Sequence, residues 1–429
     1  MKFTAAGDAI IQRRIPCDYE GYGELADFIK EGDGRFYNLE TTLNYEGECP
    51  ASQFSGGTYI RTVPEVLEDI DGFGFNMTTF NNNHAMDFSF EGFYRTLDAL
   101  NDFGIVHAGA GRTLGEAAAP RYLDTKAGRV ALIAVNTSFS PPMMAGSCTD
   151  RAPGRAGING IRIEKYINVT EDELKFIKEL ASRTMINAEY EITAKEGYFP
   201  PIPENEGKLG DMKFKLSEKS EYVMQANTED VERVKRAIFE AKMQSDYIIV
   251  SVHSHQLSGV SKEQPSKFLV DFAHTCIDAG ANAIIGHGPH LLRPIEVYKE
   301  CPIFYSLGDF ILELYSIEYA PADFFAKHGL ATDATVHELI SKRSKNFTVG
   351  LMEDRRMMLS VIPLWETEDG KLKSLKLMPI ELSKGKTKSE EGLPRRTSPE
   401  AVIDYISEMS APYGVTFKAT SDGLIECFW

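Results

Sequence analysis

The stretch from Ile284 to Phe310 determines the fold and reads I-I-G-H-G-P-H-L-L-R-P-I-E-V-Y-K-E-C-P-I-F-Y-S-L-G-D-F. An apolar run that ends at Gly286 opens it, and a second, from Pro302 to Leu307, closes it. Apolar runs bounded by Gly and Pro predict buried strands. His287 and His290 follow the first of these strands, so their rings can converge on one point. Imidazole is a common ligand for transition metals; the alternative is a polar turn whose histidines cap backbone groups.

Strands and helices alternate through the first 136 residues. Apolar runs predict strands at Lys2 to Ile10, Arg35 to Leu39, Phe73 to Phe80, from Ile105, and at Val130 to Val135. Helical spacing predicts helices at Tyr22 to Lys30, Pro64 to Ile70 and Ser89 to Phe103. This alternation is typical of α/β layering with parallel strands. Because ligands of open α/β sheets bind at the carboxyl ends of strands, the polar residues there are candidates for a site.

The segment from about residue 138 to residue 227 interrupts the alternation. A capping box at Thr170 and Glu173 predicts a helix from Glu171 to about Ala181. The rest of the segment is charged and contains proline pairs, so we expect a loop-like insertion or lid. The α/β pattern then resumes with a helix from Asp230, a strand that ends at Val252 and a helix from Ser266.

The C-terminal part is expected to be mainly β-structure. Several antiparallel strands are predicted between Asn346 and Leu382, with a turn at 368–370, and Ser398 and Pro399 open a final helix that runs to about Met409. The expected organisation is one domain over 1–311, with the insertion at about 138–227. The remaining residues, 312–429, would complete the second sheet and add the terminal helix.

Composition excludes several classes of function. The 46 basic and 63 acidic residues give a net charge of −17, which argues against nucleic acid or an anionic membrane as partner. An anionic substrate stays possible, because a metal ion can supply local positive charge. Six cysteines without a C-x-x-C motif do not suggest a disulfide framework. The sequence shows no signal peptide and no transmembrane segment, so we expect a cytoplasmic protein.

Metal-binding residue types gather at five predicted strand exits. They are Asp8, Glu40, Asn83 with His84, His253 with His255, and His287 with His290. Five of the nine histidines lie in these short polar segments. Carboxylate, amide and imidazole ligands together favour Mn, Fe or Zn. Burying Asp8 and Glu40 without a partner would be costly, so we expect a cation there, with Arg13 or Arg14 as the alternative to a metal.

These exits belong to a longer ordered series of motifs. The strings are G-D-A-I-I-Q-R at 7–13, N-L-E-T at 38–41, N-N-H-A-M-D at 82–87, H-A-G-A-G-R at 107–112, G-R-A-G-I-N at 154–159, G-H-G-P-H at 286–290 and Y-S-L-G-D-F at 305–310. The series resembles the calcineurin-like metallophosphoesterases, and most closely their CapA branch, associated with poly-γ-glutamate capsule synthesis. The resemblance implies a four-layer α/β/β/α sandwich of two mixed sheets flanked by helices.

The resemblance also implies ligands for one or two divalent ions. Asp8 and His290 would hold one ion and Glu40 would bridge to a second. The remaining ligands of the second ion would be Asn83, His253 and His287.

Further roles follow from the same resemblance. His84 would be the general acid or a hydrogen-bond donor to the transition state, and Asp87 would orient it. Arg13 would bind an anionic group of the substrate. We expect His255 on the substrate side as well, with a position behind the ligands or on the surface as its alternatives.

Four substitutions and one insertion depart from the family pattern. Ile10 stands where a histidine is expected, Glu40 replaces an aspartate, and Ser254 replaces a tryptophan. Asp309 replaces an asparagine, and one extra residue separates the histidines of the G-H-G-P-H string. Since Ile10 cannot bind a metal, the sequence predicts a single ion or weak binding of a second, and His287 is the safer ligand of its pair.

The predicted function is hydrolysis. A metal-bound hydroxide would attack a phosphoester or acyl centre, and the substrate would be a small molecule or a γ-glutamyl or phosphate-bearing compound. One alternative is a component of poly-γ-glutamate synthesis that has no hydrolase activity. The other is a hydrolase of γ-glutamyl amide bonds.

The other histidines are expected to be structural. His107 follows a strand and is predicted to bond to backbone in the core. His274 lies on a predicted helix between apolar residues, and His328 and His337 are expected at the surface.

Overall fold

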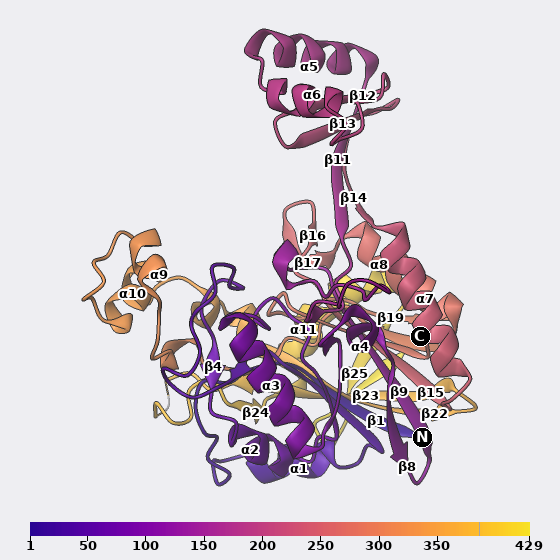
Figure 1. The fold of residues 1–429 in the computed structure, drawn as a ribbon. Coiled ribbons are helices and arrows are strands. Elements are labelled where there is room, and N and C mark those ends of the chain that lie inside the picture. The colour runs from indigo at the N-terminus through magenta and orange to yellow at the C-terminus, as the bar shows by residue number, and fades with distance from the viewer. Residues whose placement is uncertain (386) are drawn as a thin grey trace. The chain divides into compact units, whose positions relative to one another are not determined.

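The chain forms two compact units in the computed structural model, which describes residues 1–385 and 387–429. The main unit comprises Met1–Ile161 and Val231–Trp429, and the small unit is Arg162–Asp230. Figure 1 shows the elements of both units in chain order. The candidate site residues all lie in the main unit.

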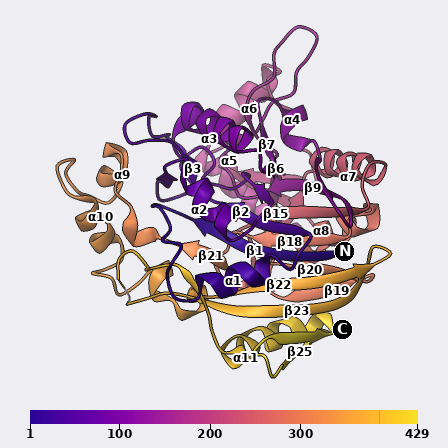
Figure 2. The ribbon, with the colours of Figure 1, turned by 90° about the horizontal axis from the view of Figure 1, so that it is seen from below.

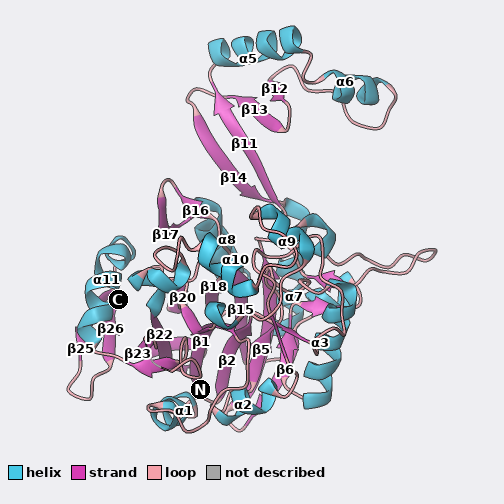
Figure 3. Ribbon diagram, turned by 90° about the vertical axis from the view of Figure 1, so that its left-hand side faces the viewer, coloured by secondary structure: helices cyan, strands magenta, loops and turns pink. Residues whose placement is uncertain are grey.

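The first sheet of the main unit has ten strands. Its order is β25-β26-β23-β22-β1-β2-β5-β6 (Figure 3). In addition, β21 pairs with β1 and β24 pairs with β23. The strands are β1 (Lys2–Ile10), β2 (Gly34–Leu39), β5 (Met77–Thr79), β6 (Val106–Ala108), β21 (Asp309–Leu312), β22 (Leu359–Glu368), β23 (Lys371–Leu382), β24 (Pro394–Arg396), β25 (Thr416–Ala419) and β26 (Ile425–Phe428). β2 and β21 run parallel to β1, whereas β22 runs antiparallel to it, so the sheet is mixed.

The second sheet has six strands in the order β19-β20-β18-β15-β9-β8. They are β8 (Arg121–Thr125), β9 (Gly128–Asn136), β15 (Tyr247–His253), β18 (Ala283–His287), β19 (Ile295–Tyr298) and β20 (Cys301–Phe304). The four central strands are parallel and the two edge strands antiparallel. Central strands such as β15 and β18 are buried along their whole length, as expected for strands covered on both faces.

The two sheets pack face to face through an apolar core. Phe3 of the first sheet stacks on Tyr247 of the second, with ring centroids 4.2 Å apart, and on Trp365, 5.2 Å away. The indole Nε1 of Trp365 donates to the hydroxyl of Tyr247 at 3.0 Å, so the one polar group of this buried ring has a partner. This core joins strands that are distant in the sequence.

Helices cover the outer faces of both sheets (Figure 1). α1 (Tyr22–Ile29), α2 (Val66–Gly72) and α3 (Ser89–Phe103) bury their apolar sides in the core beside the first sheet. α8 (Lys267–Ala279) packs on β18, and α7 (Thr228–Lys242) buries Val234 and Ile238. The predicted α/β class and the four layers are confirmed.

The C-terminal strands extend the first sheet, since β22 pairs with β1. The predicted hairpin is present: Asp369 and Gly370, with φ of 52° and 76°, connect β22 to β23. Positive φ at both central residues matches the twist of the flanking strands. The terminal helix α11 (Pro399–Ser410) ends one residue beyond its predicted end, and Figure 2 shows it next to β25. Between Leu351 and Met358 the chain forms 3-10 turns instead of the strands expected there.

Short elements complete the main unit. They are α4 (Leu114–Ala118), α9 (Ala322–Lys327), α10 (Val336–Arg343), β3 (Thr42–Leu43), β4 (Arg61–Thr62), β7 (Ala110–Gly111), β10 (Gly157–Ile158), β16 (Leu257–Ser258) and β17 (Ser261–Pro265). α9 and α10, like β25 and β26, have no counterpart among the predicted elements. No helix of the described chain is both long enough and apolar enough to cross a membrane.

The small unit has its own four-stranded sheet, so its predicted loop-like character is wrong. The order is β12-β13-β11-β14, from β11 (Ile163–Val169), β12 (Glu206–Leu209), β13 (Met212–Leu216) and β14 (Glu221–Ala226). Helices α5 (Glu171–Thr184) and α6 (Ala188–Lys195) accompany it, and α5 begins with the predicted capping box. Only Val169, Leu174 and Phe214 form its buried core, which explains the weak apolar pattern of its strands.

Candidate metal centre

The candidate ligands meet where parallel strands of both sheets end. Asp8 lies near the end of β1, and Glu40 directly follows β2. His253 and His287 are the last residues of β15 and β18, and they are register partners. The sheets therefore deliver carboxylates from one side and imidazoles from the other.

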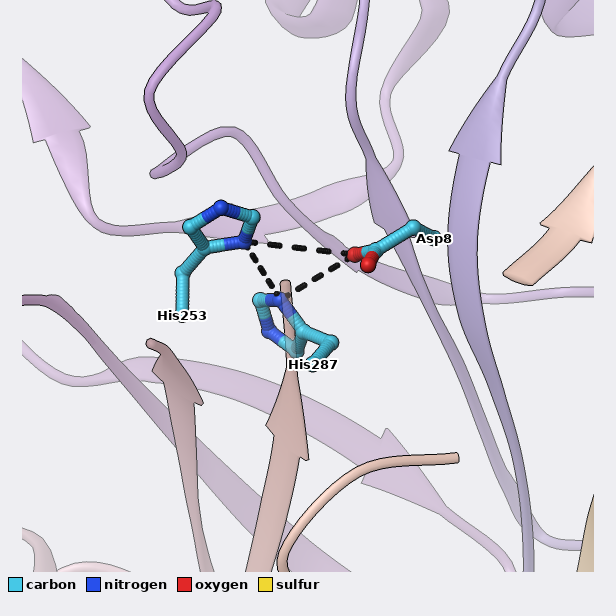
Figure 4. Close-up of side chains that lie close together, drawn as sticks. All are labelled: Asp8, His253 and His287. Atoms are coloured by element: carbon cyan, nitrogen blue, oxygen red, sulfur yellow. Dashed lines mark hydrogen bonds and ion pairs between the residues drawn. The ribbon is translucent and has the colours of Figure 1, made fainter. Parts of the chain in front are cut away.

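The first group of ligand atoms comes from Asp8, His253 and His287 (Figure 4). The Nδ1 atoms of the two histidines are 2.9 Å apart. Asp8 Oδ1 lies 3.3 Å from Nδ1 of His287 and 3.9 Å from Nδ1 of His253. All three side chains are buried, with at most 1% of their surface exposed. Two ring nitrogens and a carboxylate oxygen thus point at one another out of contact with solvent.

Neighbouring polar groups hold these ligands in place. Asn38 Nδ2 donates to Asp8 Oδ1 at 2.6 Å, and the backbone N–H of Gly288 donates to Asp8 Oδ2 at 2.8 Å. The hydroxyl of Ser251 lies 2.6 Å from Nε2 of His287, so the other nitrogen of this ring faces the shared point. Such contacts behind the ligands orient metal sites. Asn38 and Ser251 were not predicted; the signal is a polar residue inside an otherwise apolar strand.

The second group surrounds Glu40. His253 Nε2 lies 3.9 Å from Glu40 Oε1, and His255 completes the group of possible ligands. Asn83 Oδ1 is 2.7 Å from Nε2 of His253 and 3.1 Å from Nε2 of His255. Glu40 is fully buried, and neither of its carboxylate oxygens has a hydrogen-bond partner among the described residues. His255 lies within this group of possible ligands, and its expected role in substrate binding stays a prediction.

The third group joins Asp8 to His290 and Asp309. His290 Nδ1 lies 3.0 Å from Asp309 Oδ1, while Asp309 Oδ2 is buried and has no partner in the described chain. The extra residue between the two histidines is accommodated by left-handed backbone, with φ of 116° at Gly288 and 62° at His290. A positive φ at a non-glycine residue is uncommon and is often retained at functional sites. Asp309 was identified as a departure from the family but not as a ligand.

Four imidazole rings connect the three groups in a row. Ring centroids are 5.1 Å apart for His287 and His253, 5.0 Å for His253 and His255, and 5.4 Å for His255 and His290. The structure therefore brings together all six predicted metal ligands in one continuous cluster, with His255 and Asp309 added.

His84 and Asp87 lie beside this cluster, as predicted. His84 Nδ1 donates to Asp87 Oδ2 at 2.6 Å, and Nε2 lies 3.9 Å from Glu40 Oε1. Asp87 also accepts the backbone N–H groups of Gly56 and Ile60, both at 2.9 Å. Asp87 thus holds the ring with Nε2 toward the carboxylate.

Burial sets the protonation of the cluster. Burial, together with the nearby charge of Asp8, raises the pKa of Glu40 well above its usual value. Burial likewise raises the pKa of Asp309 to about 6, although His290 opposes the shift. Burial and the neighbouring ring of His255 lower the pKa of His253 well below its usual value. Burial also opposes ionisation of Asp8, but contact with His287 outweighs it and lowers the pKa of Asp8.

Arginine does not neutralise these carboxylates. Arg13 Nε lies 3.0 Å from Glu313 Oε1, and Arg14 Nε donates to Asp69 at 2.6 Å. The alternative in which Arg13 or Arg14 pairs with Asp8 and Glu40 is therefore wrong. Arg13 also donates to the backbone oxygen of residue 391 at 2.9 Å, so its guanidinium is engaged in the fold. Its role in binding substrate stays a prediction.

The remaining histidines lie outside the cluster. His107 is buried, but it bonds to the side chain of Asn101 at 3.1 Å and not to backbone as predicted. His274 bonds to Glu296 at 2.9 Å. His337 is exposed, and His328 is half-buried against a phenylalanine.

The donor set fits a divalent transition metal. Imidazole nitrogens, carboxylate oxygens and an amide oxygen are the ligands that Mn, Fe and Zn accept. A buried carboxylate without hydrogen bonds is costly unless a cation compensates for it, and Glu40 is such a group. The described residues around it offer oxygen acceptors and imidazole rings but no lysine or arginine bonded to Glu40.

Comparison with known proteins finds a family model and several relatives, most of which are named for capsule or PGA synthesis. A family model described as bacterial capsule synthesis protein PGA_cap matches residues 2–313. The uncharacterized protein y4sH of Sinorhizobium fredii is 31% identical, over 96% of this chain and 89% of that protein. The capsule biosynthesis protein CapA of Bacillus anthracis is 21% identical, over 73% of this chain and 60% of that protein. The PGA biosynthesis protein CapA of Bacillus subtilis is 42% identical over 76 residues, which are 18% of this chain and 19% of that protein.

Proposed function

We propose that this chain, which belongs to the family of bacterial capsule synthesis proteins PGA_cap within the metallophosphoesterase-like superfamily, is a metal-dependent hydrolase of phosphoester or acyl substrates. The observation that carries the proposal is the unbonded, buried carboxylate of Glu40 among histidines at the strand ends. Burying a carboxylate without a partner destabilises a fold, whereas a bound cation would compensate for its charge.

Asp8, Glu40, Asn83, His253 and His287 would hold the ion. A divalent ion there would supply a nucleophile from water at neutral pH and offset the charge of a developing oxyanion. The chain's own contribution is to fix the ligands before binding, through Asn38, Ser251 and the N–H of Gly288. Preorganised ligands lower the cost of assembling a reactive geometry.

His84 would transfer the proton. Its Nδ1–H bond to Asp87 leaves Nε2 directed at the cluster. When Nε2 carries a proton, Asp87 stabilises the imidazolium, and the ring can donate that proton to a leaving-group oxygen or nitrogen. The backbone N–H groups of Gly56 and Ile60, which donate to Asp87, hold its carboxylate in place.

A second candidate reaction is cleavage of a γ-glutamyl amide bond. It is favoured by the names of two relatives, which refer to capsule or PGA biosynthesis. Both reactions need the same oxyanion stabilisation and the same proton donor, so the geometry of the site is compatible with either reaction. Substrates with different leaving groups distinguish the two reactions.

The test is a set of chromogenic assays on the metal-loaded protein. The substrates are p-nitrophenyl phosphate, bis-p-nitrophenyl phosphate and γ-glutamyl-p-nitroanilide, each with Mn²⁺, Zn²⁺ or Fe²⁺. We expect turnover of at least one substrate that is lost in His84→Ala and in His287→Ala. Absence of turnover of all three in protein that holds the ion would favour a role in capsule synthesis without hydrolysis.

A further inference from the structure

We infer that Asp309 is a ligand of a second metal ion and replaces the histidine that is missing at position 10. The site consists of Asp8, His290 and Asp309. The inference rests on the proposed function, because it assumes that the first site also holds an ion. It changes the expectation from one ion, or a weakly bound second one, to a pair.

Position 10 contributes nothing to this site. Ile10 is 1% exposed and packs in an apolar cluster that contains Ile60, Leu312 and Met352. No ligand atom is available from Ile10. A carboxylate has to reach Asp8 from another strand for the site to be complete.

Asp309 arrives by the pairing of β1 with β21. The two strands are parallel, and Asp8 and Asp309 are register partners. The turn before β21 approaches β1 closely: the backbone N–H of Asp8 donates to Gly308 O at 3.2 Å, and a Cβ atom on Gly7 would lie 1.8 Å from that oxygen. Only glycine fits at position 7, and this contact sets Asp309 beside Asp8.

The carboxylate of Asp309 is buried and has an oxygen available to bind a metal ion. It is fully buried, its Oδ1 lies 3.0 Å from His290 Nδ1, and its Oδ2 has no partner among residues 1–385 and 387–429. Asp8 already holds donors on both of its oxygens, from Asn38 and from the N–H of Gly288. Two buried carboxylates on adjacent strands repel one another unless a cation lies between them.

The charge of the cluster supports a pair of ions. Asp8, Glu40 and Asp309 are three buried carboxyl groups, and no lysine or arginine bonds to any of them in the described chain. One divalent ion would leave the set with excess negative charge when all three are ionised. A second ion at Asp309 would turn this into a net positive charge that an anionic substrate can offset, and oxygen with imidazole ligands suits Mn²⁺, Fe²⁺ or Zn²⁺.

The test compares metal content in wild type and Asp309→Asn. The amide keeps an oxygen for the N–H of His290 and removes the charge, and asparagine is the residue that the CapA pattern has at this position. Protein is loaded with Mn²⁺, freed of excess by desalting, and analysed by elemental mass spectrometry and by electron paramagnetic resonance. We expect two ions per wild-type chain with spin coupling between them, and one uncoupled ion in Asp309→Asn.

Added variants separate this inference from the proposed function. Asp309→Glu keeps the carboxylate and should hold more than one ion per chain. His287→Ala should affect the first site, and thermal unfolding in EDTA shows whether each variant is folded. Two ions per chain in Asp309→Asn would overturn the role of Asp309. A single ion in wild type that is lost in His287→Ala would also overturn it. Either result would leave the hydrolase proposal standing. No ion in wild type would overturn both.

Discussion

The Nδ1 atoms of His253 and His287 lie 2.9 Å apart because the two residues are register partners at the ends of parallel strands. Ring nitrogens this close share either one ring proton, in an Nδ1–H···Nδ1 hydrogen bond, or a cation. With Asp8 Oδ1 3.3 Å from His287 Nδ1, a divalent cation is the better occupant.

Glu40→Gln should separate the stability of the metal-free protein from metal binding. In EDTA the variant should unfold at the same temperature as wild type or higher, because the substitution removes a buried carboxyl group that lacks a hydrogen bond. With free Mn²⁺ at about 100 times Kd, wild type should gain about 2.7 kcal/mol of unfolding free energy, and the variant much less. Calorimetry in both conditions measures this. A large loss of stability in EDTA with a normal gain in Mn²⁺ would contradict the assignment.

His84→Ala should lower the turnover number by about 10²- to 10⁴-fold, the usual contribution of a general acid. The metal content should not change, because His84 is outside the three groups of possible ligands. Steady-state kinetics and elemental analysis on the same sample test both statements. Loss of the ion together with activity would make His84 a ligand.

The buried ring of His107 should make the protein less stable to unfolding as the pH falls. Burial lowers its pKa from 6.5 to about 4, so between these values the unfolded chain binds a proton that the folded chain excludes. The unfolding free energy should therefore be unaffected by this group above about pH 6.5 and fall by about 2 kcal/mol between about pH 7 and pH 5. His107→Gln should remove that part of the pH dependence. Denaturant titrations at pH 7 and pH 5 give the unfolding free energies. An equal decrease in unfolding free energy for wild type and variant would refute the prediction.

Arg13→Ala should destabilise the fold by about 2 kcal/mol, less than a fully buried pair because the arginine side chain is 25% exposed. The substitution leaves Glu313 buried without its partner, and Glu313→Gln in the same chain should restore most of the loss. Chemical denaturation gives both values. An Arg13→Ala variant of normal stability with a strongly raised KM would instead support the substrate role predicted from the sequence.

The sequence pattern predicted the α/β class and most of the cluster for a physical reason, whereas the four layers were implied by the family resemblance. Buried parallel strands are continuous apolar runs, and the polar residues that end them are visible without a structure. Asp8, His253 and His287 are all of this kind. Their distances follow from strand register, which the sequence does not specify.

Two features escaped prediction, each for a different reason. Asp309 meets Asp8 only through the pairing of β21 with β1, which joins residues 301 positions apart. The strands of the small unit are largely solvent-exposed: β11 reads I-E-K-Y-I-N-V and buries only Val169 fully. Apolar periodicity is therefore weak there, and charge alone suggested loops.

The most direct test of the central claim is the metal content of His287→Ala beside wild type and His337→Ala. His337 is an exposed histidine outside the cluster, so its variant controls for the loss of an imidazole. All three proteins are loaded with Mn²⁺, Fe²⁺ or Zn²⁺, desalted and analysed for ions per chain. We expect the same metal content in wild type and His337→Ala and at least one ion per chain fewer in His287→Ala. Equal metal content in all three proteins would contradict it.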